Sequence, residues 1–175
     1  NTSYMDVVKH SYYVDKTLLI RDLVDDQVPV ILFTRPRRFG KTLALDMLKS
    51  YFEKTREDTS VYFMDKKIWA CGEKYRKLQG AFPVISITFK DAKFSDWGST
   101  FEAIKNVIRD EYMRHSELFS SDCLNPVEQD YLLRLQSDQL NEVEYTRSLL
   151  NLERMLEKHH HSKAIVLIDE YDTPI

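Results

Sequence analysis

Residues 35–42 read RPRRFGKT, and they follow directly on the apolar run VPVILFT at residues 28–34. The run is too short and too continuous for an amphipathic helix, and it is typical of a buried parallel strand. Residues 41–54, KTLALDMLKSYFEK, then repeat apolar side chains at helical spacing. Strand, loop and helix in this order predict a phosphate-binding loop, although Arg35 replaces the glycine that usually opens the pattern G-x-x-x-x-G-K-[ST].

The last residues of this loop are of the types that bind phosphate. Successive backbone N–H groups and the N-terminus of the next helix would point at the phosphate oxygens. Lys41 is expected to reach the β- and γ-phosphates, and the Thr42 hydroxyl is expected to bind Mg²⁺. Pro36 has no N–H, but it lies before these amides, so the working end of the loop is complete. The expected nucleotide-binding residues are Arg37, Arg38, Phe39, Gly40, Lys41, Thr42 and Leu43.

A second acidic motif follows later in the chain. Residues 164–168, AIVLI, predict another buried strand, and Asp169 and Glu170 come directly after it. Ligands lie at the carboxyl ends of parallel strands, so Asp169 is expected to hold the Mg²⁺ shell together with Thr42. Glu170 is expected to polarise the attacking water as a general base, with Lys41 as the other catalytic residue. The two motifs in this order predict a nucleotide site.

The rest of the chain alternates strand and helix patterns, which favours an α/β fold with a parallel sheet. Residues 83–89, PVISITF, predict a strand that tolerates a proline at its first position. Asp15 is expected to cap the first helix, and residues 99–102 have the form of a capping box. The expected helices cover residues 16–26, 41–54, 99–112, 126–136 and 140–158, with loops and short helical pieces over 55–82.

Composition narrows the class of protein. The chain has 175 residues, enough for one domain, and a net charge of −3, so no general basic excess points to nucleic acid. Cys71 and Cys123 show no C-x-x-C spacing, which fits a reducing compartment. No apolar run reaches the length of a membrane span, and the first residues do not have the pattern of a signal peptide. A cytoplasmic location is the default expectation.

The chain resembles the AAA-ATPase-like domain of many bacterial proteins, which is often joined to a C-terminal PD-(D/E)xK-type nuclease domain. The matching stretches are YYVDKTLLI at 12–20, TRPRRFGKTLALDMLKSYF at 34–52, PVISITFKD at 83–91 and VLIDEYDTPI at 166–175. The resemblance implies a P-loop NTPase of the additional-strand type, in which a later strand lies between the loop strand and the strand of the acidic pair. The sequence is therefore expected to be the N-terminal part of a longer protein, cut after the acidic motif.

Several other groups of residues allow a functional and a structural interpretation. Arg35, Arg37 and Arg38 would contact phosphate or nucleic acid, or they would pair with acids such as Asp169 or Asp172. The stretch from Tyr12 to Lys16 would lie near the base or serve capping and packing. Asp172 would tune the metal or cap the next segment. The run at residues 159–161 is read as histidines at a helix C-terminus, which the helix dipole favours, and not as a metal site.

These observations predict an ATPase that binds ATP and Mg²⁺ and cleaves the β–γ bond. The alternatives are a nucleotide-gated switch with little turnover and a P-loop kinase, against which Glu170 argues because a kinase needs no base to activate water. No base-reading motif separates ATP from GTP. Self-association, and nucleic-acid contacts through regions outside this chain, stay open as partners.

Overall fold

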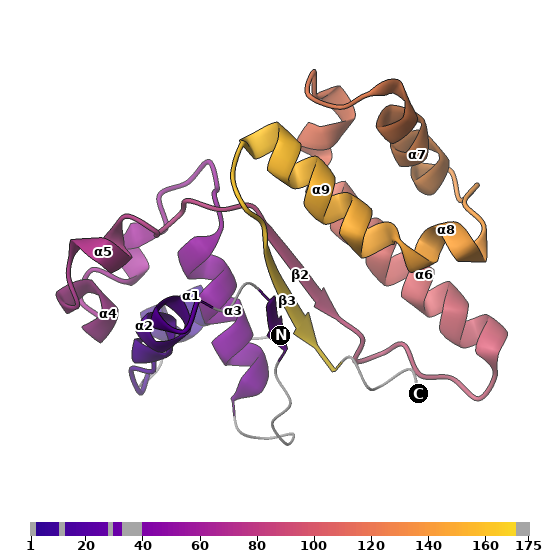
Figure 1. The fold of residues 1–175 in the computed structure, drawn as a ribbon. Helices are drawn as coiled ribbons and strands as arrows, with labels where there is room; N and C mark the ends of the chain where they lie inside the picture. Colours follow the sequence, from indigo (N-terminus) through magenta and orange to yellow (C-terminus); the bar gives the residue numbers. More distant parts are fainter. Residues whose placement is uncertain (1–2, 11–12, 28–29, 33–39, 171–175) are drawn as a thin grey trace. The chain divides into compact units, whose positions relative to one another are not determined.

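The computed structural model describes residues 3–10, 13–27, 30–32 and 40–170 (Figure 1). The chain divides into two compact units. Unit 1 holds residues 1–84 and 165–167, and unit 2 holds residues 85–164 and 168–175.

The described strands form one three-stranded sheet. Its strands are β1 (Val30–Leu32), β2 (Val84–Thr88) and β3 (Ile165–Asp169), in the order β1-β3-β2. The Ile165 N–H donates to the Pro83 carbonyl and the Phe89 N–H donates to the Asp169 carbonyl, so β2 and β3 run parallel. The three strands thus fall where the apolar runs predict them, and the α/β class is confirmed.

The strand order does not test the additional-strand type that the family resemblance implies, because the later strand of that type is expected outside this sequence. In an additional-strand NTPase another strand separates the loop strand from the acidic strand, whereas here β3 pairs directly with β1. The described part of the chain holds three strands, and β2 lies on the other side of β3. The additional-strand type therefore stays a prediction.

Unit 1 is built around helix α3 (Lys41–Phe52), which confirms the helix expected after the loop. Its buried face includes Met47, Leu48 and Tyr51, at the helical spacing seen in the sequence. The Phe63 ring stacks on Tyr4, with ring centroids 5.1 Å apart, and meets the Tyr51 ring edge-on at 4.9 Å. The other elements of this unit are α1 (Tyr4–His10), α2 (Leu18–Asp25), the 3₁₀ helix η1 (Ser60–Tyr62), α4 (Lys67–Ala70) and α5 (Glu73–Arg76).

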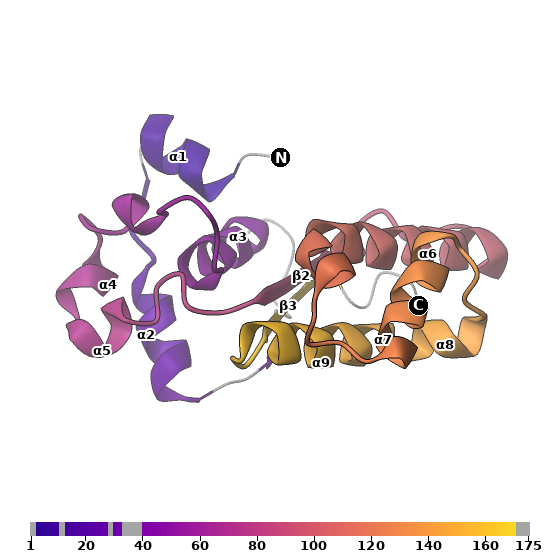
Figure 2. The ribbon, with the colours of Figure 1, turned by 90° about the horizontal axis from the view of Figure 1, so that it is seen from above.

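Unit 2 is mainly helical. Helices α6 (Trp97–Arg114) and α9 (Ser148–His160) lie side by side in both views (Figures 1 and 2). The 3₁₀ helix η2 (Ser116–Ser120), α7 (Pro126–Gln136) and α8 (Glu142–Thr146) complete it. Its core is made of apolar side chains from α6, α7 and α9, all at most 5% exposed: Ile108, Tyr112, Leu132, Leu135, Leu152, Met155 and Leu156.

Two of the expected helix starts are wrong by a few residues. Helix α2 begins after Thr17 and not after Asp15. Helix α6 begins after Asp96, whose carboxylate accepts from the Ser99 N–H at 2.8 Å, so the box expected at 99–102 lies inside the helix. In both places a second polar residue close to the real cap offers the same local pattern. The cap at Asn125 is confirmed, because its side chain accepts from the Glu128 N–H.

The single helix expected over 140–158 is in fact two helices. Asn141 and Glu144 form a capping box that starts α8, and the chain leaves the helical path at Arg147 (φ −101°, ψ 2°). The Ser148 carbonyl accepts from the buried Tyr112 hydroxyl at 2.6 Å, and the Ser148 hydroxyl donates to the Tyr145 carbonyl. A periodic apolar pattern continues across the break, so only packing against α6 reveals it.

Candidate functional site

The start of α3 has the backbone geometry that an anion site needs. Gly40 is the N-cap, with φ 69° and ψ 22°, in the left-handed region that favours glycine. The Ala44 N–H donates to the Gly40 carbonyl at 2.9 Å and closes the first turn. The N–H groups of the first helical residues, Lys41 to Leu43, have no carbonyl acceptor within the helix. Together with the helix dipole they make this end of α3 favourable for phosphate.

The conformation, and not a lack of space, explains why position 40 is a glycine. A Cβ built at Gly40 would find the Lys16 Nζ at 3.6 Å as its nearest neighbour, which is ordinary van der Waals distance. The cost of a side chain there would come from the positive φ. The same distance shows that the ammonium of a second lysine, Lys16, lies beside the loop glycine, from which it is separated by 24 residues in the sequence.

The residues on either side of Lys16 fix its position. The Asp15 carboxylate accepts from the Thr17 N–H at 2.9 Å, from the Thr17 hydroxyl at 2.7 Å and from the Lys67 N–H at 2.8 Å. The Thr17 hydroxyl in turn accepts from the Ile68 N–H at 3.1 Å. Asp15 and Thr17 together therefore cap the N-terminus of α4, and we call this pair the α4 cap. Asp15 therefore does cap a helix, but it is α4, 52 residues further on, and not the helix that the sequence predicted.

A small pocket opens next to Gly40. Its volume is about 160 Å³, and the described residues that line it belong to unit 1. The Tyr13 ring forms part of the wall, with its hydroxyl donating to the Met47 sulfur at 3.4 Å and its edge against Tyr4. Burial raises the pKa of Tyr13, so the phenol stays neutral at physiological pH. The lining residues are Val7, Tyr13, Val14, Lys16, Gly40, Leu43, Ala44 and Met47.

Asp46, an acidic residue of α3, has a structural role. Its carboxylate accepts from the Tyr4 N–H at 2.6 Å, at the first residue of α1. This contact joins α1 to α3 and supports the wall of the pocket that carries Val7. The sequence contains no local signal for it, because the partner lies 42 residues away.

The acidic pair lies at the carboxyl end of β3, as predicted. Asp169 is the last residue of the strand and only 5% exposed, and its carbonyl accepts from the Phe89 N–H at 3.1 Å. Glu170 is partly buried and has φ 50°, a left-handed conformation that costs a non-glycine residue energy. Gln27, Asp138 and His161 share this conformation, so it does not single out Glu170, and the role expected for Glu170 stays a prediction.

Several residues named from the sequence fall outside the described part of the chain. They are Tyr12, Arg35, Arg37, Arg38, Phe39 and Asp172. The readings given for them stay predictions. Of the expected nucleotide-binding residues, Gly40, Lys41, Thr42 and Leu43 are described, and they stand together at the start of α3.

The histidine run has a structural role. His159 shares a hydrogen bond with the Ser121 hydroxyl at 2.6 Å, and His160 contacts a Glu117 carboxylate oxygen at 3.1 Å. Both contacts tie the segment around η2 to the end of α9. Within the described residues no three His, Cys, Asp or Glu side chains are arranged to hold a metal ion.

Glu111, a buried acid in unit 2, was not predicted from the sequence. Glu111 is 6% exposed, and one of its oxygens accepts from the Ser86 N–H of β2 at 3.0 Å. Burial opposes its ionisation, but the hydrogen bonds from His115 and Arg114 outweigh burial and hold the pKa of Glu111 below its usual value. The side chain thus pairs a backbone N–H of a strand that ends the described sheet.

Similarity to a known protein family covers almost the whole chain. A family model described as a predicted AAA-ATPase matches residues 2–175. The chain belongs to the AAA-ATPase-like family. No curated protein and no solved structure matches it. The match supports an ATPase in general, and with it the use of a nucleotide.

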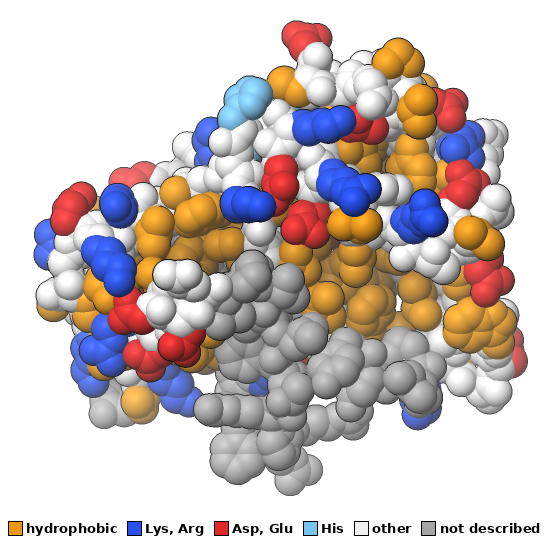
Figure 3. Space-filling view, viewed as in Figure 1, with side chains coloured by type: hydrophobic (Ala, Val, Ile, Leu, Met, Phe, Trp, Pro, Cys, Tyr) orange, Lys and Arg blue, Asp and Glu red, His pale blue; other side chains and the backbone are white. Residues whose placement is uncertain are grey.

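The other expected partners receive no support from the described surface. On the face of unit 2 seen in Figure 3, basic and acidic side chains are intermixed, so the described residues there form no basic stripe for nucleic acid. None of the described helices combines the length and the apolar character that crossing a membrane requires.

Proposed function

We propose that this AAA-ATPase-like chain binds ATP and hydrolyses it with the help of Mg²⁺. The observation that carries the proposal is the start of α3, where a left-handed glycine is followed by a lysine and a threonine at the first two helical positions. Backbone amides, a cation and a hydroxyl then converge on one anion, which is the arrangement that phosphate-binding loops use. The family match supports the same class of activity.

In the proposed mechanism each group has one task. Lys41 and the amides at the start of α3 hold the β- and γ-phosphates and stabilise the charge that develops during transfer. Thr42 and Asp169 offer a hydroxyl and a carboxylate, the oxygen donors that Mg²⁺ prefers. When bound, the ion neutralises phosphate charge. Glu170 accepts a proton from the attacking water. Coupling to a nuclease domain elsewhere in a longer protein stays a prediction.

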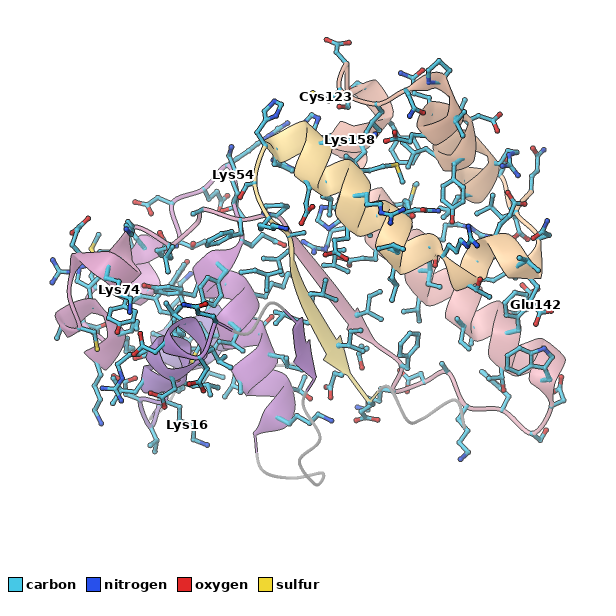
Figure 4. The ribbon with its side chains drawn as sticks, viewed as in Figure 1. Lys16, Lys54, Lys74, Cys123, Glu142 and Lys158 are labelled. Carbon is cyan, nitrogen blue, oxygen red and sulfur yellow. The ribbon has the colours of Figure 1, made fainter. Side chains whose placement is uncertain are left out.

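The first test measures Mg²⁺-ATP binding by calorimetry, on the longest native protein that contains this chain. Lys41→Ala should weaken binding about 10- to 100-fold, because it removes a charge-assisted hydrogen bond. Lys54→Ala is the matched control, since Lys54 is an exposed lysine just beyond the other end of α3 (Figure 4). Equal affinities for the wild type and Lys41→Ala would refute the phosphate site.

A second measurement separates hydrolysis from simple binding. Glu170→Gln should keep ATP affinity within about twofold and lower phosphate release by about 100-fold or more, the usual contribution of a general base. Wild-type protein that binds ATP but releases no phosphate would indicate a nucleotide-gated switch. Unchanged turnover in Glu170→Gln would remove Glu170 from the mechanism.

A further inference from the structure

The pocket beside Gly40 has no task in the mechanism above. Helix α1, the segment 13–16 and α3 enclose it, and these elements come from three separate places in the sequence. Most of its lining is apolar, and the exposed Lys16 stands on the side of Gly40. As far as the described residues go, the pocket has an apolar lining and one cation, Lys16, at its mouth. Such a pocket fits a ligand with an apolar end and an anionic end.

The size of the pocket limits what can enter it. A volume of about 160 Å³ equals that of roughly five water molecules in the liquid. Whole drug-sized ligands occupy about 300–1,000 Å³, so the pocket would hold one ring system and not a complete nucleotide. A nucleobase is such a ring system, flat and less polar than the rest of a nucleotide. Tyr13, Leu43 and Met47 offer the aromatic and aliphatic surface on which it would rest.

Lys16 supplies the charge on the phosphate side. Its ammonium makes no ion pair with a described residue, and it lies within van der Waals distance of a Cβ placed on Gly40. The α4 cap holds the residues on both sides of it, so the backbone of this lysine is anchored although its side chain is exposed. An anchored and uncompensated cation next to a phosphate loop is favourable for a phosphate oxygen.

We propose that the segment Tyr13–Lys16 forms a second wall of the nucleotide site. The pocket takes the base, and Lys16 contacts the phosphate nearest to it. This inference rests on the proposed function. It adds the binding of the base, which the residues of the two sequence motifs would not contact. It also assigns a binding role to Lys16, which stands outside the phosphate-binding loop.

The test compares two ligands, Mg²⁺-ATP and Mg²⁺-tripolyphosphate, which share a phosphate chain and differ in the base. Lys16→Gln should weaken both by about tenfold, and the loss should shrink at high salt because the contact is exposed. Lys54→Gln should change neither; this lysine is separated from Lys16 by the length of α3, about 18 Å along its axis (Figure 4). An unchanged affinity in Lys16→Gln would overturn the role of Lys16.

The base is tested by filling the pocket. Ala44→Leu keeps a strong helix former in α3 and should weaken ATP about tenfold or more while leaving tripolyphosphate unchanged. Ala44→Ser is the control of similar size. If Ala44→Leu lowers the melting temperature, Val14→Ala replaces it, because Val14 is 61% exposed. Val14→Ala should weaken ATP binding by about threefold and leave tripolyphosphate binding unchanged, because the bound base would cover part of the Val14 side chain.

The outcomes separate this inference from the proposed function. Wild-type protein that binds tripolyphosphate as tightly as ATP would overturn the base pocket and leave the phosphate site standing. Equal losses for both ligands in the pocket variants would do the same, since they would indicate a structural effect. Wild-type protein that binds neither ligand would overturn the proposed function together with this inference.

Discussion

Removing the Asp15 carboxylate should destabilise unit 1 through α4. The carboxylate accepts three hydrogen bonds, two of them from backbone N–H groups, and it caps a helix of only four residues. Loss of a helix cap costs about 0.5–2 kcal/mol, and a second acceptor is lost at Thr17. We therefore expect Asp15→Ala to lower the free energy of unfolding by about 2 kcal/mol. With a urea m-value of about 2 kcal/mol/M, the unfolding midpoint would fall by about 1 M.

Fluorescence can follow this change where it occurs. Trp69 lies in α4, its carbonyl accepts from the Arg76 side chain at 2.7 Å, and that guanidinium lies over its ring. The other tryptophan, Trp97, lies in α6 of unit 2 and is 59% exposed. In a Trp97→Phe background the emission therefore reports on α4 during urea unfolding. Asp26→Ala is the control, because the exposed Asp26 carboxylate makes no hydrogen bond or ion pair with a described residue, and its removal should cost less than about 0.5 kcal/mol.

The sign of the pH dependence follows from the same contacts. Burial opposes ionisation of Asp15, but the hydrogen bonds from Thr17 and Lys67 outweigh it and hold its pKa below the ordinary 3.8. The stabilisation is then present above pH 3.8 and is lost as the pH falls through the lowered pKa. A midpoint shift of Asp15→Ala below about 0.3 M at neutral pH, or a shift that grows under acid, would refute the reasoning.

Two further predictions concern other parts of the chain. Gly40→Ala should cost about 1–2 kcal/mol through the left-handed backbone and weaken Mg²⁺-ATP binding, as calorimetry and urea unfolding would show; an unchanged stability would contradict the backbone argument. Burial favours a neutral His115, but its hydrogen bonds to Glu111 and Glu117 raise its pKa above 6.5. The difference in the free energy of unfolding between wild type and His115→Gln should therefore be largest below pH 6.5 and shrink as the pH rises through the raised pKa. A difference that grows toward pH 9 would contradict this prediction.

Local patterns were sufficient for the strands and for helices α2, α3, α6 and α7, whereas α1 was not expected and α8 and α9 were expected as one helix. The apolar runs at 83–89 and 164–168 mark β2 and β3, because a buried strand has to be apolar along its length, and the run at 28–34 contains β1. The helix after the loop also follows from its repeat of apolar residues. The motif residues at the start of α3 and at the end of β3 were predictable for the same reason, since their backbone is set by neighbours in the sequence.

Helix ends and the break at Arg147 were less predictable. Asp15 and Ser99 are good capping residues, and so are Thr17 and Asp96 close by. Because the alternative capping residues have nearly equal local energies, contacts with the rest of the fold decide where each helix starts. At Arg147 the apolar repeat is unbroken, and the hydrogen bond between Tyr112 and Ser148 is what accompanies the change of direction.

The amino-acid order thus determined the kind of site, a phosphate loop followed by an acidic strand, because short-range geometry makes both. The tertiary structure decided which residues surround it. Asp15 caps a helix 52 residues away, and Asp46 holds one 42 residues away. Lys16 reaches Gly40 only through such contacts. A carboxylate or an ammonium can form hydrogen bonds or ion pairs with many groups equally well. The packing of the apolar core decides which of these groups lies within reach.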